Sequence, residues 1–259
     1  MAAADLFSEG SKVESPKYAR VVLKISGEGL CRPGTFGVDG EELQRIANEI
    51  KLVADLGVEL CVVVGGGNIV RGETIARDSP IEVVTGHYMG MLGTVINALA
   101  VQDALEARGV PTRVQSAVAV DRVCEKFIRR RALRHLEKGR VVIFAGGTGN
   151  PYVTTDSCAA LRASEISADV VLKATKVDGV FTADPLTDAS ARLFEHLCFD
   201  EVVDRRLGVM DVAAIDLCRR NNIPIVVFNL KQPGHMAAVV RGERIGTLVD
   251  ADAPRTSLA

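Results

Sequence analysis

Three apolar segments of this sequence each run directly into a loop of glycines and polar side chains. They are VVLKISGEG at residues 21–29, CVVVGGGN at residues 61–68 and VVIFAGGTGN at residues 141–150. Each apolar run predicts a strand buried on both faces, and glycine then ends it. The carboxyl ends of parallel strands meet at one sheet edge, where backbone N–H groups and helix N-termini bind anions. We therefore expect a phosphate-rich ligand at that edge.

Strands and helices alternate along the chain, which predicts an α/β fold. The expected architecture is a three-layer α/β/α sandwich with a mainly parallel central sheet. The helix expected at residues 89–108 is apolar around much of its circumference, which favours burial on two sides or a subunit contact. The other expected helices span residues 41–56, 124–137, 157–166, 201–206 and 211–220, and the expected strands span residues 19–25, 58–64, 113–120, 141–144, 168–172, 224–229 and 246–249.

The chain shows neither a Pro/Ser-rich linker nor an internal repeat, so we expect one domain over residues 18–250. Residues 1–17 are expected to form a flexible leader and residues 251–259 a C-terminal tail. The N-terminus lacks a basic start followed by an apolar core, so no secretory signal is expected. No run of about 18 apolar residues occurs, so no membrane span is expected. These features favour a cytoplasmic protein.

Composition argues against several functional classes. The net charge of -2 over 259 residues argues against a dedicated nucleic-acid binder. The six cysteines are scattered, without C-x-x-C or zinc-type Cys/His spacing, so reduced and mostly buried thiols are expected. Neither G-x-x-x-x-G-K-[ST] nor a G-x-G-x-x-G after the first strand is present, so P-loop and dinucleotide sites both lose support.

Three charged residues lie close to the glycine loops. Lys24, at the end of the first strand, either extends its stem along apolar surface or directs its ammonium at the ligand, and the loops favour the second role. Asp156 either caps a helix or orients Lys24, and both roles are compatible. Arg71 either binds phosphate or is a solvated loop residue.

Long sequence blocks resemble the amino acid kinase superfamily and, within it, the bacterial-type uridylate (UMP) kinases. The resemblance covers about residues 18–249 and implies the fold described above. It rests on LKISGE at 23–28, FGVD at 36–39, VVVGGGNIVRG at 62–72, YMGMLGTVINALA at 88–100, GTGNPYVTTDSCAALRASEI at 147–166, ADVVLKATKVDGVFTADP at 168–185, and VFNL at 227–230 followed by Pro233-Gly234.

The resemblance implies that ATP and UMP give ADP and UDP with Mg²⁺, in a cytoplasmic homohexamer. It implies Lys24 and Asp156 as the catalytic pair. GTP activation and UTP inhibition are typical of the family, and Arg113 and Arg140 fall where some members hold GTP. The implied ATP contacts are Lys24, Ile25, Ser26, Gly27, Gly67, Arg71, Thr175, Phe181 and Asp184; the implied UMP contacts are Gly66, Thr148, Gly149, Asn150, Pro151, Tyr152, Val153, Thr154 and Thr155.

The sequence departs from the family pattern at the acceptor site. Members usually carry an aspartate that contacts UMP where this chain has His87, followed by Tyr88-Met89. We expect His87 to contribute a different hydrogen bond there, and an altered site is the alternative. Gln102 and Glu106 stand where some members carry basic residues. Two other functions stay open: a kinase of this fold with a carboxylate or carbamate acceptor, and a nucleotide-binding sensor without catalysis.

Overall fold

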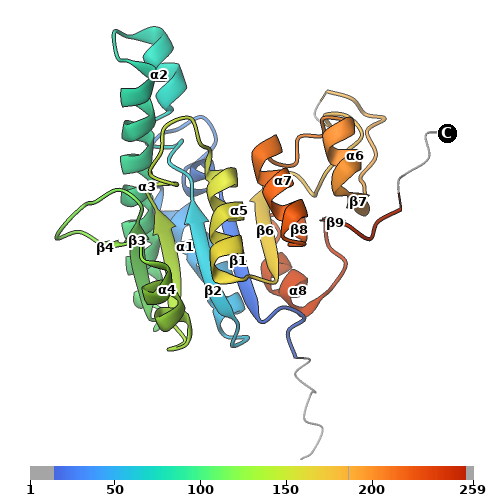
Figure 1. Cartoon of the computed structure of the whole chain (residues 1–259), viewed down its shortest axis with the longest axis horizontal. Helices are drawn as coiled ribbons and strands as arrows, with labels where there is room; N and C mark the ends of the chain where they lie inside the picture. The colour runs from blue at the N-terminus through green and yellow to red at the C-terminus, as the bar shows by residue number, and fades with distance from the viewer. Residues whose placement is uncertain (1–14, 186, 255–259) are drawn as a thin grey trace, which may run out of the picture.

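A single sheet runs through the computed structural model, which describes residues 15–185 and 187–254 (Figure 1). Within these residues the sheet has nine strands in the order β4-β3-β5-β2-β1-β6-β8-β9-β7. The strands are β1 (Arg20–Ile25), β2 (Glu59–Val64), β3 (Thr112–Ser116), β4 (Glu125–Lys126), β5 (Val141–Ala145), β6 (Val170–Thr175), β7 (His196–Cys198), β8 (Ile225–Asn229) and β9 (Thr247–Asp250).

The pairing of the strands is mainly parallel, as predicted. Of the described pairs, β8 with β9 is antiparallel, and the others are parallel. The three strands that precede the glycine loops, β1, β2 and β5, are direct neighbours at the centre. Their carboxyl ends therefore meet at one edge, which brings the three loops together.

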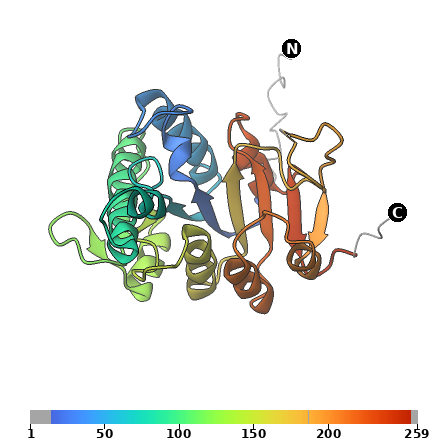
Figure 2. The ribbon, with the colours of Figure 1, turned by 90° about the horizontal axis from the view of Figure 1, so that it is seen from above.

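Helices cover both faces of the sheet, which confirms the three-layer α/β/α architecture (Figure 2). Side chains of successive strand residues point to opposite faces. Val21 and Leu23 of β1 therefore pack with α1 and α3, whereas Val22 packs with α5 and α7. The helices are α1 (Gly40–Ala54), α2 (Gly72–Asp78), α3 (Val83–Glu106), α4 (Arg129–Leu136), α5 (Thr155–Ile166), α6 (Phe199–Asp204), α7 (Val212–Arg220) and α8 (His235–Arg241), with a short 3-10 helix η1 (Gly27–Leu30).

Helix α3 begins six residues earlier than the sequence indicates, at Val83 instead of residue 89. Gly86 has a low helix propensity, so the sequence around it does not indicate that the helix has already begun. In the structure Gly86 lies against α2, where a Cβ would be 2.5 Å from the Gly72 carbonyl oxygen. The glycine thus allows two helix backbones to touch.

Other elements differ at their ends. The helix expected from residue 124 begins at Arg129, because β4 occupies Glu125–Lys126, and β3 ends at Ser116 instead of residue 120. The short elements α2, β7 and α8 were not predicted. The leader (1–17), domain (18–250) and tail (251–259) remain a prediction, and residues 1–14 and 255–259 lie outside the described part.

All six cysteines are free, and five are buried, as predicted. Burial raises the pKa of Cys158 to about 11 and that of Cys218 to about 12, so both thiols stay protonated. None of the helices in the described residues is long and apolar enough to cross a membrane.

Candidate active site

Lys24 lies near the carboxyl end of β1, with its side chain only 11% exposed. The strand is buried from Val21 onward, and the partners of Lys24 in the neighbouring strands are Val63 of β2 and Lys173 of β6. Its ammonium contacts the carboxylate of Asp156, with Nζ 2.7 Å from Oδ1. The two residues proposed as the catalytic pair therefore meet, although they are far apart in the sequence.

Asp156 is in the first turn of α5, and Thr154 is the N-cap of this helix. The Thr154 hydroxyl accepts hydrogen bonds from the backbone N–H groups of Asp156 and Ser157, both at 3.1 Å. The capping role considered for Asp156 thus belongs to Thr154. Because the Thr154 hydroxyl caps the helix, the Asp156 carboxylate does not serve as the cap and can pair with lysine side chains.

A second lysine, Lys173 on β6, contacts the other oxygen of the same carboxylate. Its Nζ lies 2.7 Å from Asp156 Oδ2. Burial alone would raise the pKa of Asp156, but the charges of Lys24 and Lys173 outweigh it and hold that pKa below its ordinary value. The carboxylate is therefore ionised at neutral pH. Lys173 was not predicted as a site residue, although the tetrapeptide VVLK occurs at both 21–24 and 170–173.

The glycine loops pack backbone against backbone beside this cluster. A Cβ on Gly27 would lie 2.8 Å from the Gly65 carbonyl oxygen, and one on Gly66 would lie 2.4 Å from that of Gly90. A Cβ on Gly67 would meet nothing within 4 Å. Gly27 and Gly66 thus allow close packing, whereas the Gly67 backbone is open to a ligand.

Two buried asparagines, which were not predicted as site residues, hold the second loop. Asn68 and Asn97 exchange side-chain hydrogen bonds at 3.1 and 2.7 Å. Asn97 also donates to the Gly65 carbonyl oxygen at 2.7 Å. A buried amide needs such partners, so the pair fixes the loop against α3. Both residues lie within the family-like blocks, which was the available signal.

A cavity of about 290 Å³ opens on one side of the loops. Its position between α3 and the loop before α5 suits a small molecule such as the expected phosphoryl acceptor, UMP. Of the described residues expected to contact UMP, Thr148, Gly149, Asn150 and Pro151 lie in that loop outside the cavity lining. The expected UMP contacts that do line the cavity are Gly66, His87, Tyr152, Val153, Thr154 and Thr155.

His87 contacts the loop before α5 directly. Its Nδ1 accepts a hydrogen bond from the Tyr152 backbone N–H at 2.7 Å, and the two rings meet edge to face at 4.8 Å. Tyr152 has a positive φ of 63°, which is uncommon for a residue with a side chain. The histidine thus holds a backbone conformation that the loop alone would seldom adopt.

The other side of the loops carries charged groups and a larger cavity of about 710 Å³. Gly67 and Arg71 line it, together with Glu28 and Lys176. Glu28 contacts Arg71 and also Lys176, whose Nζ is 2.8 Å from Oε2. Two cations beside an open glycine loop can bind a polyphosphate, with Glu28 balancing their charge in its absence. Glu28 and Lys176 were not predicted as site residues.

The other residues expected to contact ATP lie around the same edge of the sheet. Ile25 and Gly27 are buried and Ser26 is half-buried, directly after Lys24. Thr175 ends β6, and its hydroxyl donates to the Val177 carbonyl oxygen at 2.7 Å. Phe181 forms a bridge to Leu193, and Asp184 is exposed in the following loop.

The two arginines expected at an effector site lie away from this edge. Arg113 is near the start of β3 and Arg140 directly precedes β5, so both are at the amino ends of neighbouring strands. Arg113 pairs with Glu106 at 3.1 Å, and Arg140 donates to His135 Nδ1 at 3.1 Å. They are therefore at the end of the sheet opposite the lysines.

The chain matches known proteins over most of its length. The family model described as the amino acid kinase family matches residues 19–229. The uridylate kinase of Paramagnetospirillum magneticum is 58% identical over 236 residues, which are 91% of this chain and 98% of that protein. Uridylate kinase PUMPKIN, chloroplastic, of Arabidopsis thaliana is 52% identical over 241 residues, covering 93% of this chain and 71% of its own length.

The fold also matches solved structures. The crystal structure of UMP kinase from Bacillus anthracis superposes with a TM-score of 0.88 at 41% identity, covering 91% of this chain and 97% of that one. UMP kinase from Ureaplasma parvum gives a TM-score of 0.85 at 36% identity, with 90% and 99% covered. From the family match and these relatives, the chain belongs to the amino acid kinase family.

Proposed function

We propose that this protein is a UMP kinase, which transfers the γ-phosphoryl group of ATP to UMP and gives ADP and UDP. The relatives named uridylate kinase, at 58% and 52% identity, support this activity. The main structural observation in support of this activity is the Lys24–Asp156–Lys173 cluster, at the edge of the sheet where the glycine loops meet. Gly67 of these loops lines both cavities.

The chemistry suits a site without a general base. A phosphate oxygen of UMP attacks the γ-phosphorus while the bond to the bridging oxygen of ADP breaks. A second phosphate pKa of about 6 leaves the attacking oxygen largely ionised at neutral pH. Catalysis then needs positioning and neutralisation of charge on the transferred group. Lys24 supplies positive charge, and Asp156 orients its ammonium.

Binding of the two nucleotides is assigned to the two sides of the loops. The proposed donor contacts are Lys24 through Gly27, Gly67, Arg71, Thr175, Phe181 and Asp184. The proposed UMP contacts are Gly66, His87 and Thr148 through Thr155. The backbone N–H groups of residues 65–67 and 146–149 would hold the phosphates.

Mg²⁺ fits this site if the nucleotide phosphates supply most of its ligands. In the described part of the chain, no three His, Cys, Asp or Glu residues gather in a metal-binding cluster. Mg²⁺ commonly binds through substrate phosphates, waters and one or two carboxylates, so such a cluster is not required. When bound, the ion would neutralise phosphate charge.

An acceptor panel tests the function. ADP release is measured with UMP, CMP, dUMP, N-acetylglutamate and aspartate as acceptors. We expect turnover with UMP and little with the carboxylates. Activity with a carboxylate alone would contradict the proposal, and tight UMP binding without turnover would indicate a sensor.

We further propose a cytoplasmic homohexamer, with Arg113 and Arg140 contacting a GTP or UTP effector. Tyr88, Leu92 and Ile96 recur every four residues on α3 and are about half exposed, which supports a subunit contact there. Sedimentation velocity tests the assembly. Activity measured with GTP and UTP, in wild type and in Arg140→Met, tests the effector assignment.

A further inference from the structure

Lys24 and Lys173 form a pair of neighbouring buried lysines on adjacent strands. They are register partners in the parallel ladder between β1 and β6. Their side chains are only 11% and 15% exposed. Two ammonium groups in this position repel one another and have lost most of their water, so both need a counter-charge.

Asp156 provides this counter-charge to both lysines at once. Each carboxylate oxygen takes one ammonium, at 2.7 Å in both cases. The Lys173 contact is a hydrogen bond from Nζ to Oδ2, and the Lys24 contact is an ion pair with Oδ1. A charge-assisted hydrogen bond of this length is strong and directional. The cluster of two cations and one anion also retains one positive charge, which suits an anionic phosphoryl group.

Lys173 makes a second contact that Lys24 does not share. Its ammonium also donates to the backbone carbonyl oxygen of Val209, which is buried in the segment before α7. An ammonium has three donor hydrogens, so the two contacts use most of its capacity. Lys173 therefore ties Asp156 to the protein interior, and its ammonium is not available as a primary phosphate ligand.

The segment before α7 is itself fixed to the start of α5. Asp211 caps α7 by accepting from the Ala214 backbone N–H at 2.9 Å. It also accepts from the Ser157 hydroxyl at 2.8 Å and from the Thr154 hydroxyl. The starts of α5 and α7 are thus joined by side-chain bonds, and Lys173 adds a bond at the Asp156 carboxylate.

We propose that Lys173 is a positioning residue for phosphoryl transfer: by holding Asp156 Oδ2 it fixes the carboxylate whose Oδ1 orients the Lys24 ammonium. The inference rests on the proposed kinase function. It assigns Lys173 an effect on turnover that acts through Asp156 and Lys24. A buried ion pair with a purely structural role would affect stability alone, and a phosphate ligand would affect nucleotide binding.

Ionisation of the cluster gives a second readout. The groups that face Asp156 are Lys24 from β1 and Lys173 from β6, and Asp211 faces Lys173 from the start of α7. Burial lowers the pKa of Lys173, and Asp156 limits that shift. Lys173 helps to keep the pKa of Asp156 low, so removal of Lys173 should raise the pKa of Asp156. The acid limb of the kcat profile should then move to higher pH.

The test compares Lys173→Met and Lys173→Gln with Lys51→Met. Lys51 forms a pair with Asp55 at 2.7 Å on the exposed face of α1, so this control removes a Lys–Asp pair away from the site. For Lys173→Met we expect kcat with UMP to fall about ten- to a hundred-fold, as for a lost charge-assisted hydrogen bond and a misplaced catalytic group. Lys173→Gln keeps a donor and should be intermediate, whereas Lys51→Met should match wild type.

Binding measurements separate positioning from the other roles. Calorimetry with UMP and with a non-hydrolysable ATP analogue should give Kd values within about three-fold of wild type for Lys173→Met. A large loss of nucleotide affinity would overturn the inference in favour of a phosphate ligand. Unchanged kcat and an unmoved acid limb would overturn it in favour of a structural ion pair.

The folding of each variant and the activity of wild type with UMP are the two controls. Circular dichroism establishes that each variant is folded, and if Lys173→Met is not, Lys173→Gln and Lys173→Arg are used in the same assays under the same criteria. Wild type that fails to phosphorylate UMP contradicts the proposed function. Wild type that does so while every folded Lys173 variant retains full kcat overturns this inference alone.

Discussion

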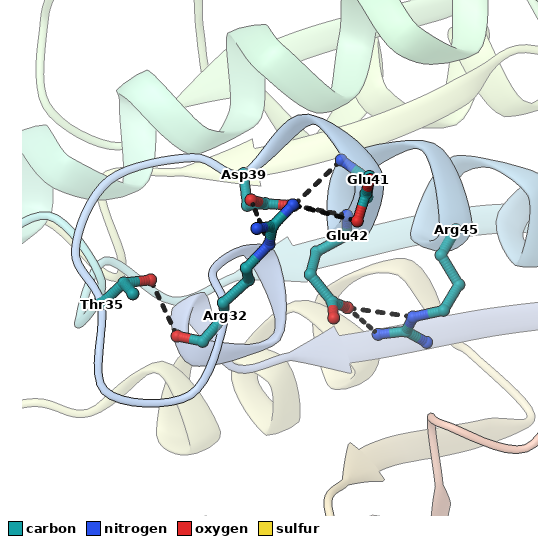
Figure 3. Close-up of polar contacts among 6 residues, drawn as sticks. All are labelled: Arg32, Thr35, Asp39, Glu41, Glu42 and Arg45. Carbon is teal, nitrogen blue, oxygen red and sulfur yellow. Dashed lines mark hydrogen bonds and ion pairs between the residues drawn. The ribbon is translucent and has the colours of Figure 1, made fainter.

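Helices α1 and α5 both begin with a capped turn beside charged side chains, but the two starts differ in which residue provides the cap. At α1 the Asp39 carboxylate accepts from the backbone N–H groups of Glu41 and Glu42 and also pairs with Arg32 (Figure 3). At α5 the Thr154 hydroxyl is the cap. The carboxylate at α1 is therefore used for local structure, whereas that of Asp156 remains for Lys24 and Lys173.

Solvent exposure widens this difference. In the α1 cluster the side chains of Arg32 and Glu41 are 58% and 85% exposed, so water screens their attraction. At the α5 start the side chains of Lys24 and Asp156 are 11% and 14% exposed. Charges that are shielded from water act strongly on a bound phosphoryl group. The α5 start should thus dominate activity, and the α1 start should contribute modestly to stability.

The largest expected effect is from Lys24→Ala. Removing the ammonium takes away the positive charge that we propose acts on the transferred group, so kcat should fall by about a hundred- to a thousand-fold. The ADP-release assay with UMP measures this, and circular dichroism should show an intact fold. The matched control is Lys51→Ala on α1, which should keep wild-type kcat. Near-normal turnover in Lys24→Ala would remove Lys24 from the mechanism.

Asp156→Asn should alter how stability depends on pH. Because the folded-state pKa of Asp156 is lowered, its ionised form stabilises the fold at neutral pH. This contribution is fully present above the unfolded carboxylate pKa of about 4 and is lost as the pH falls through the lower folded value. The difference in free energy of unfolding between wild type and Asp156→Asn should therefore shrink on acidification to about pH 3.

Urea unfolding at several pH values measures that difference. Asp39→Asn at the α1 start is a useful comparison, because this carboxylate pairs with Arg32, whose side chain is 58% exposed, and not with two buried lysines. A difference for Asp156→Asn that stays constant from neutral to acid pH would contradict the role of the two lysines.

The loop edge could be predicted from sequence because its signals are local. Buried strands that end in glycines, such as those before Gly27 and Gly65, specify both the sheet and the edge where its loops meet. Lys24 was identified because it stands directly before such a loop. Lys173 has the same VVLK context, but the loop after it lacks a glycine cluster. The predicted strand ended at residue 172, so Lys173 was placed in the following loop without a role in the site.

Other features depended on contacts that sequence spacing does not specify. The Asn68–Asn97 pair joins a loop to a helix, and only packing shows that the two amides meet. Likewise, the choice of Thr154 over Asp156 as the cap depends on a shift of two residues in the helix start. Helix boundaries of that precision follow from tertiary contacts, here those of Asp211, more than from local propensity.

Thr154→Ala and Asp39→Ala should separate the two helix starts. Each removes an N-cap, so each should lower the free energy of unfolding by about 1 kcal/mol. Thr154→Ala should also lower kcat by about three- to ten-fold, because Asp156 lies in the turn that loses its cap. Asp39→Ala should leave kcat unchanged. Equal kcat in both variants would show that the α5 cap does not position the carboxylate.

His87→Ala tests the loop that leads into the α5 start. The variant removes the acceptor of the Tyr152 backbone N–H and the ring contact with Tyr152. Loss of one such hydrogen bond should raise KM for UMP by about two- to ten-fold. KM for ATP in the same variant is the internal control. His87→Asp restores the usual family residue and an acceptor, so a KM for UMP as high as that of His87→Ala would contradict a hydrogen-bonding role.

The smallest effect is expected at the α1 start, from Glu41→Gln. This change removes an exposed pair in which Glu41 Oε2 lies 3.0 Å from Arg32 Nη2. Surface pairs contribute little, and an acidic residue in a first turn adds a few tenths of a kcal/mol, so stability should fall by less than about 1 kcal/mol. The difference should vanish in about 1 M salt, because screening removes both contributions. Arg32 also lines the larger cavity of about 710 Å³. A fall in kcat would therefore show that the α1 cluster positions Arg32 for the nucleotide. The α1 and α5 starts would then be less separate than their exposure indicates.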